Sequence, residues 1–363
     1  MIYHLSLIYL ELLYDKCVTT LLIHNNEISY RGDRTNTQNI SLMMRSVGIR
    51  TLVAVPHSEQ NHIPSIDEMK RLGIEIELYK DFESLKSIAN SYGISHSLFV
   101  HDGRYNNLWI PNTKHLVYAV FNHFEPHGHV YAYVSQWLFK HALRKKVGRS
   151  PSSIIPEQSE TNSPFSIDKT TKVTWVPHTV IPLEGDGKYF KSYFGIPDGF
   201  FLIGRIGGYT EFNDPLIHEG LMRLVESDDS IYVVLINTRP FYLHPRIKYI
   251  GFISENLKWD FYAACDLFLN GRLMGESFGF SIVEPLMLGK PIIAPSPIRN
   301  RKMDRHHAQI LHKSGLLYKS VNHFIRAIQQ IKKCGYEENV LKELVKDFTF
   351  DSVRNRFIHE FIE

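Results

Sequence analysis

Two glutamates, Glu276 and Glu284, stand eight positions apart in the stretch GESFGFSIVE, and most residues between them are small or apolar. A helix is predicted to begin near Gly279, after a buried strand and a short loop that contains Glu276. The first N–H groups of a helix have no intrahelical acceptor, and they suit an anion such as a phosphate. Ser277 and Gly279 would let the backbone approach that phosphate closely.

The two carboxylates are spaced to hold an elongated ligand at its two ends. Glu284 lies about one turn into the predicted helix, where a carboxylate can accept two hydrogen bonds from a vicinal diol such as a ribose. Glu276 precedes the helix and can reach a different part of the same ligand. Each glutamate alone is better explained as a surface acid or as an acid that complements the helix dipole. Together they favour two clamps on one ligand over a catalytic acid–base pair.

The composition is typical of a globular protein in a reducing compartment. The 363 residues exceed what one hydrophobic core usually organises, so two domains are expected. A formal net charge of +3 is too small to argue for a nucleic-acid partner. Cys17, Cys265 and Cys334 lie far apart and form no C-x-x-C pair, which favours a cytoplasmic location without disulfides.

Apolar strands and amphipathic helices alternate in both halves of the chain. This pattern predicts two α/β Rossmann-like domains with parallel sheets that face one another across an interdomain cleft, where ligands bind at the carboxyl ends of the strands. The predicted domains cover 1–182 and 183–345, followed by a C-terminal helix over 346–363. Two local predictions are specific. Ser65–Gly73 is a helix capped by Ser65 with Glu68, and 130–146 is a single helix.

Three further segments have less specific interpretations. The apolar stretch over residues 1–14 is short of the roughly 20 residues that span a bilayer, and it is expected to pack as a helix or strand. Residues 148–172 are rich in Ser, Pro and Thr and predict a surface loop. The basic clusters HALRKKVGR and RNRKMDRHH are expected to be solvated, which leaves contact with an anionic membrane surface open.

The glutamate stretch and the strands around it resemble the E-x7-E signature of the retaining GT-B glycosyltransferases, the group 1 or family 4 type. The resemblance covers the C-terminal half well and the N-terminal half loosely. In that family the first glutamate contacts the donor sugar, the second contacts the nucleotide ribose, and the backbone after the first holds the diphosphate. Carried over, these are Glu276, Glu284 and the donor-binding stretch Ser277, Phe278, Gly279 and Phe280.

A second match lies in FLIGRIGGYTEFNDP, where the family places an arginine and then a lysine on the donor diphosphate. Arg205 matches the arginine, but Thr210 and Glu211 occupy the region of the lysine. Arg272, which follows a neighbouring strand, is a candidate substitute, although a surface arginine at a strand end explains it equally well. The resemblance also implies that the backbone near Phe252 contacts the nucleotide base.

In the N-terminal half the resemblance implies a glycine-containing loop near the donor phosphates, for which Arg31 and Gly32 are the candidates. A histidine beyond a strand often contacts the donor sugar in the family. His123 and His127 both fit that position and are not separated by the sequence. With His129 and Glu125 they could instead bind a metal, but they do not share one helix face, and the family's chemistry is normally metal-independent.

The resemblance implies transfer of a sugar from a nucleotide-diphosphate sugar to an acceptor hydroxyl with retention of configuration. Arg205, Arg272 and the helix N-terminus would stabilise the departing diphosphate, which would itself take the acceptor's proton. No tightly bound cofactor or metal is expected. The acceptor would be a glycan, a lipid-linked molecule or a protein. The 346–363 helix would return to the first domain. No nucleic-acid partner is expected. A non-catalytic nucleotide-sugar binder, which the missing lysine motivates, and a sugar-nucleotide epimerase remain alternatives.

Overall fold

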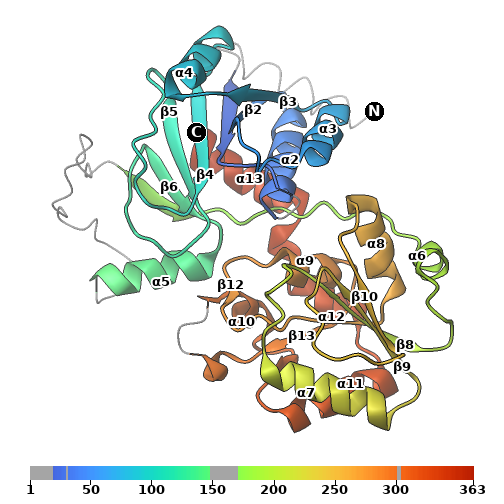
Figure 1. Cartoon of the computed structure of the whole chain (residues 1–363). Coiled ribbons are helices and arrows are strands. Elements are labelled where there is room, and N and C mark those ends of the chain that lie inside the picture. The colour runs from blue at the N-terminus through green and yellow to red at the C-terminus, as the bar shows by residue number, and fades with distance from the viewer. Residues whose placement is uncertain (1–18, 30–31, 148–170, 301–303) are drawn as a thin grey trace, which may run out of the picture. The chain divides into compact units, whose positions relative to one another are not determined.

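The computed structural model describes residues 19–29, 32–147, 171–300 and 304–363. The chain forms two compact units (Figure 1). The first takes its described residues from Met1–Tyr133, Ala142–Val176 and Arg354–Glu363, and the second takes its own from Val134–His141 and Pro177–Val353. Arg31, the apolar stretch over 1–14 and nearly all of the predicted loop over 148–172 lie outside the described residues.

The first unit contains a seven-stranded sheet in the order β3-β2-β1-β4-β5-β6-β7, and its neighbouring strands pair in parallel. The strand order reverses between β1 and β4, as in Rossmann folds. The strands are β1 Thr20–Asn25, β2 Arg50–Pro56, β3 Glu75–Tyr79, β4 His96–His101, β5 Lys114–Ala119, β6 Val130–Tyr133 and β7 Lys172–Trp175. Its helices are α2 Gly32–Arg45, α3 Ile63–Arg71 and α4 Phe82–Ser91. The helix α5 Gln136–Val147 is shared, because its residues up to His141 belong to the second unit and the rest to the first.

The second unit repeats this plan with a six-stranded sheet in the order β10-β9-β8-β11-β13-β15, and its chain reversal falls between β8 and β11. A two-stranded sheet pairs β12 with β14. The strands are β8 Phe201–Ile206, β9 Ile231–Ile236, β10 Ile247–Ile250, β11 Leu267–Leu269, β12 Gly275–Glu276, β13 Ile292–Pro295, β14 Asp304–Arg305 and β15 Leu317–Tyr318. The helices are α6 Gly187–Phe194, α7 Pro215–Ser227, α8 Glu255–Ala264, α9 Phe280–Met287, α10 His306–Leu311, α11 Val321–Cys334 and α12 Glu338–Glu343.

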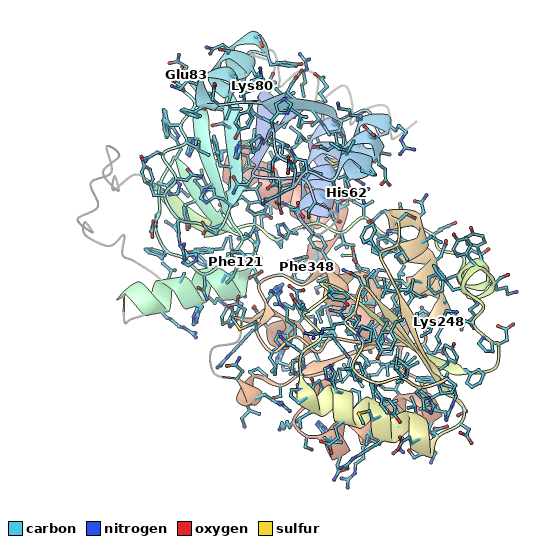
Figure 2. All side chains as sticks on the ribbon, viewed as in Figure 1. His62, Lys80, Glu83, Phe121, Lys248 and Phe348 are labelled. Carbon is cyan, nitrogen blue, oxygen red and sulfur yellow. The ribbon has the colours of Figure 1, made fainter. Side chains whose placement is uncertain are left out.

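The central strands are buried along their whole length, which explains their continuous apolar sequences. Every residue of β1 and of β9 is buried. Helices cover the sheet of each unit, as a parallel sheet requires (Figure 1). Near the start of α9, Phe348 (labelled in Figure 2) packs on Phe278 and His306 with ring centroids 5.4 and 5.5 Å away. The expectation of two parallel-sheet α/β domains is confirmed.

Two local predictions are wrong in detail. The helix predicted to be capped by Ser65 begins at Ile63, because its N-cap is His62 and the Ser65 hydroxyl bonds the His62 ring at 2.8 Å. The predicted single helix over 130–146 begins only at Gln136. Its first residues form β6, because their aromatic and apolar side chains are buried between β5 and β7. The segment between β7 and β8 contains α6, which Asp186 caps.

The segment Arg354–Glu363, which includes the end of α13 (Phe350–Phe357), packs on β5 and β7 of the first unit. The Arg356 guanidinium lies 3.7 Å from the Trp175 ring centroid and donates a 2.7 Å hydrogen bond to the Trp175 carbonyl. Lys114 Nζ donates to the Ile362 carbonyl at 3.1 Å, and Phe361 meets the ring of Tyr118 edge-on.

Candidate active site

The carboxyl ends of β8 and β11 are where ligands bind in a sheet of this topology, because the strand order reverses between them. Arg205 lies near the end of β8, and Asn270 directly follows β11. The loop that leaves β11 carries both Arg272 and Glu276. The topology therefore brings Arg205, Arg272 and Glu276 to one edge of the second unit.

Glu276 is held by side chains from its own loop. Its carboxylate is buried, and it accepts a 2.8 Å hydrogen bond from Asn270 Nδ2 and a 3.1 Å bond from Arg272 Nη1. Burial raises the pKa of this carboxyl, while Arg272 and Asn270 oppose that rise. The two donors fix the orientation of Glu276 and favour its ionised form.

Gly279 and the start of α9 closely follow Glu276 in the chain. Gly279 has φ +87°, and it accepts from the N–H groups of both Ile282 and Val283. The N–H groups of Phe280 and Ser281, in the first turn, have no acceptor within the helix. This helix start therefore offers backbone donors beside Glu276, and they suit a phosphate.

Replacing Gly279 by alanine is expected to destabilise the fold by about 1–3 kcal/mol and to displace Glu276. An added Cβ would lie 3.0 Å from Cβ and Cγ of Glu276, at a φ that alanine rarely adopts. Urea unfolding measures the loss of stability, and donor binding measures the displacement. Gly195→Ala is the matched control, because Gly195 has φ +60° but nothing within 4 Å of its Cβ position. Equal loss of donor binding in both variants would contradict the role of the Glu276 contact.

Glu284 lies inside α9 and is 3% exposed. Lys258 Nζ and the Tyr262 hydroxyl, both from α8, each donate to one of its carboxylate oxygens at 2.6 Å. Burial raises the pKa of Glu284, and Lys258 opposes the rise. Sequence reasoning missed both α8 residues, although their spacing of four places them on one helix face.

Arg205 is buried, and its guanidinium ties together the loops that follow β8 and β9. Nη1 donates to the Thr238 hydroxyl at 2.7 Å and to the Asn237 carbonyl at 3.0 Å, and Nη2 donates to the Gly208 carbonyl at 2.9 Å. Burial lowers the pKa of Arg205 to about 10, and the carboxylates of Glu211 and Glu276 oppose this. Its charge therefore remains at neutral pH and lies close to Glu276.

Glu211 occupies the region where the resembling family has its lysine. Its carboxylate accepts from the Gly208 N–H at 3.2 Å and pairs with Arg272 Nη2 at 3.3 Å. Arg272 thus bridges Glu211 and Glu276, and its side chain is 28% exposed. A phosphate that binds Arg272 must compete with Glu211 for the guanidinium.

Four exposed apolar side chains follow the carboxyl ends of the strands in the second unit. Phe252, the predicted base-contact position, is 52% exposed beyond β10. Tyr209, Met274 and Ile298 follow β8, β11 and β13 and are at least half exposed. The exposure of Phe252 is consistent with the predicted contact at that position.

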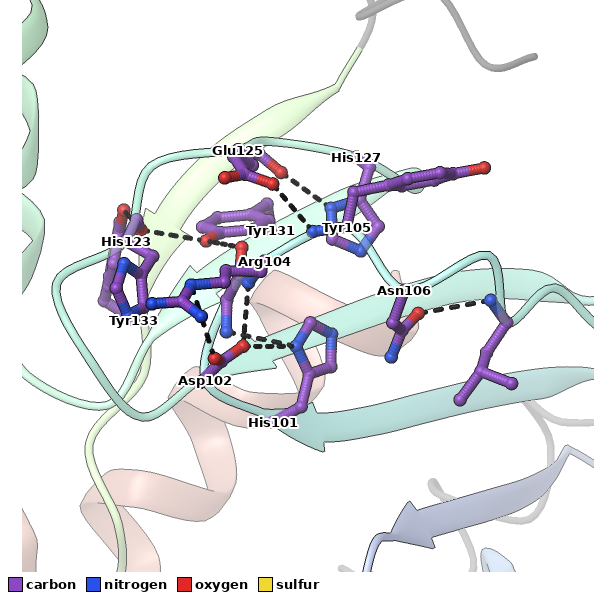
Figure 3. Close-up of polar contacts among 12 residues, drawn as sticks. His101, Asp102, Arg104, Tyr105, Asn106, His123, Glu125, His127, Tyr131 and Tyr133 are labelled. Atoms are coloured by element: carbon purple, nitrogen blue, oxygen red, sulfur yellow. Dashed lines mark hydrogen bonds and ion pairs between the residues drawn. The ribbon is translucent and has the colours of Figure 1, made fainter. Parts of the chain in front are cut away.

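The two histidines that the sequence did not separate lie in different surroundings in the first unit (Figure 3). His127 is buried, its Nδ1 lies 2.6 Å from the Glu125 carbonyl, and its ring stacks on His101 with centroids 5.6 Å apart. Burial lowers the pKa of His127. His123 is partly exposed, and its carbonyl accepts from the Tyr131 and Tyr133 hydroxyls. Of the two, His123 is the one whose side chain a ligand of the first unit can reach.

Gly32, the other candidate of this unit, is the first residue of α2, directly after the undescribed Arg31.

Within the described ranges, no cluster of three or more His, Cys, Asp or Glu side chains is arranged to hold a metal ion. No helix in that same part of the chain combines the length and apolar character needed to cross a membrane.

The architecture is that of the GT-B fold, as comparison with solved structures shows. A glycosyltransferase from Rickettsia africae ESF-5 is 12% identical, with TM-score 0.66 over 96% of this chain and 98% of that one. HepE from Anabaena, in complex with UDP-glucose, is 13% identical, with TM-score 0.66 over 94% and 98% of the two chains. The pneumococcal O-GlcNAc transferase GtfA, in complex with UDP and GlcNAc, is 8% identical, with TM-score 0.66 over 95% and 98%.

Sequence comparison adds a family match. Residues 242–346 match the model of the family described as glycosyl transferases group 1. This segment includes Phe252, Lys258, Arg272, Glu276 and Glu284, so most of the site of the second unit lies inside it. The match supports the predicted resemblance to that family. No curated protein matches the chain in sequence.

Proposed function

We propose that the protein is a glycosyltransferase that moves a sugar from a nucleotide-diphosphate sugar to an acceptor hydroxyl with retention of configuration. The observation that carries the proposal is the arrangement of Glu276, Gly279 and Glu284 around the start of α9. This arrangement lies at the ligand-binding edge of a GT-B unit and inside the segment that matches the group 1 family.

The donor would lie along this edge, with its sugar, diphosphate, ribose and base each held by a different feature of the second unit. Glu276 would hold the sugar, the backbone of Ser277–Phe280 the diphosphate, and Glu284 the ribose, while the residues near Phe252 would meet the base. Arg205 and Arg272 would add positive charge beside the diphosphate. Uridine is the first base to test, because HepE and GtfA were both solved with a uridine nucleotide.

The chemistry needs no nucleophile from the protein. The bond between the sugar C1 and the diphosphate oxygen breaks, and a bond from the acceptor oxygen to C1 forms on the same face. The acceptor's proton passes to the departing phosphate. The protein's part is to stabilise the charge that grows on that phosphate, and preorganised backbone N–H groups and arginines do this in a water-poor site.

Thermal unfolding with UDP-, GDP- and ADP-sugars tests the donor, since a ligand that binds the native state raises the melting temperature. Product analysis with glycan, lipid-linked and protein acceptors then tests transfer, and the anomeric configuration of the product tests retention. Conversion of the donor sugar without any acceptor would instead identify an epimerase. A stabilising donor that is never turned over would identify a non-catalytic binder.

A further inference from the structure

The carboxylate of Glu284 already has one donor on each oxygen. Lys258 Nζ lies 2.6 Å from Oε1, and the Tyr262 hydroxyl lies 2.6 Å from Oε2. A carboxylate accepts about four hydrogen bonds in all. About two acceptor positions therefore remain, which is the number that a ribose diol requires.

The Lys258 ammonium group beside Glu284 forms ion pairs with two carboxylates. Lys258 Nζ also pairs with Glu255 at 2.7 Å, and Trp259 Nε1 donates to Glu255 at 3.2 Å. The side chains of Lys258 and Glu255 are only 12% and 15% exposed. Removing charges from water is costly, and such buried pairs add little to stability compared with apolar residues of similar size. The network is therefore poorly explained by stability alone.

Among the described residues, β13 and α12 also pack closely on α9, and neither places a charged side chain against this carboxylate. β13 carries no ionisable side chain, and α12 carries Glu338, Lys342 and Glu343. Glu338 lies against Gly289, beyond the C-terminal end of α9. Lys342 pairs with Glu338. The protonation state of Glu284 therefore depends mainly on its neighbours in α8.

We propose that Lys258 and Tyr262 are positioning residues that keep Glu284 ionised and direct its two remaining acceptor positions to the ribose diol of the donor. This inference rests on the proposed function, and it adds a determinant of nucleotide choice. The pair makes the site discriminate between ribonucleotides and 2′-deoxyribonucleotides.

The test compares dissociation constants for UDP and 2′-deoxy-UDP, with the GDP and ADP pairs measured alongside. A hydrogen bond to a charged group corresponds to about 10- to 150-fold in affinity, so the wild type is expected to prefer the ribonucleotide by at least tenfold. In Lys258→Met this preference falls to within about twofold. Affinity for the deoxynucleotide changes far less, because the phosphate contacts are untouched.

Lys332→Met is the matched control. Lys332 also forms an ion pair, with Asp228, but Asp228 precedes β9 and so lies at the opposite edge of the same sheet. This control is expected to keep the wild-type preference. A Lys258→Met variant with the full preference would overturn the proposal, as would a wild type that binds ribonucleotides without preferring them. A wild type that binds none of the three ribonucleotides would instead refute the proposed function.

The pH dependence of UDP binding separates positioning from packing. Binding weakens as Glu284 becomes protonated, and without the Lys258 cation the pKa of Glu284 rises further. The Lys258→Met variant is therefore expected to lose affinity at a higher pH than the wild type does. If Lys258→Met lowers the affinity for UDP by the same factor at every pH, the proposal is overturned. Should Lys258→Met fail to fold, Tyr262→Phe removes a single hydroxyl and is judged by the same preference and pH profile.

Discussion

Glu276→Gln is expected to lower sugar transfer by about 100-fold or more while nucleotide affinity changes by only a few fold. The amide keeps the size of the side chain but removes the charge that Asn270 and Arg272 orient toward the proposed sugar position. Steady-state rates with the donor found by thermal unfolding measure the first quantity, and calorimetric titration with the free nucleotide measures the second. Transfer that persists within tenfold of wild type would contradict the assignment of Glu276.

Glu211→Gln is the control that isolates the sugar contact from the loss of an ion pair. Glu211 and Glu276 both pair with Arg272, so each variant removes one carboxylate partner from the same guanidinium. Only Glu276 follows β11 into the start of α9. We expect Glu211→Gln to retain transfer and to bind the donor more tightly, because Arg272 no longer has a competitor for phosphate.

Acid is expected to destabilise the first unit strongly between pH 7 and pH 5. Burial lowers the pKa of His24 and His115 to about 3 and that of His101 to about 4, against an ordinary value of 6.5. The unfolded chain therefore takes up protons below about pH 6.5 where the native state does not, and stability falls from there toward the native pKa. Each histidine contributes a loss of about 2 kcal/mol by pH 5, which lowers the melting temperature by more than about 10 °C in total.

Melting temperatures measured from pH 7 to pH 5 test this expectation, and His115→Phe identifies its origin. The His115 ring stacks between Phe99 and Trp109, with centroids 4.7 and 4.6 Å away, so phenylalanine preserves the stacking and removes one titrating group. The acid-induced drop is expected to shrink by at most about a third in this variant, because burial lowers the pKa of His127 in the same unit as well. His323→Gln, at an exposed position, is the control. An undiminished drop in His115→Phe would show that other groups govern the acid sensitivity.

The fold class was predictable because its signal is local and repeated. Continuous apolar strands such as β9 alternate with helices, and only a parallel sheet covered on both faces accommodates that pattern. β6 was mistaken for the start of a helix, because a four-residue apolar run carries no period of its own. The prediction that Ser65 is the N-cap was wrong, because the N-cap is His62, three residues earlier.

The residues of the candidate site that were predictable belong to short sequence motifs. The glutamates Glu276 and Glu284 were found by their spacing, and α9 starts where the glycine indicated. The partners of Glu284 come from elsewhere in the chain. Lys258 reaches Glu284 from α8, and Arg205 donates to carbonyls beyond β9. Contacts of this kind depend on which elements pack together, and neither periodicity nor spacing specifies that.

The packing of Arg354–Glu363 on the first unit has a consequence for how the protein is made. A ribosome releases the strands of that unit long before it reaches Arg356 and Phe361, which cover Trp175 and Tyr118. The second unit can complete its sheet while the first still exposes this surface to chaperones and proteases. Of the two units, the one whose strands are synthesised first is therefore the last to complete its fold.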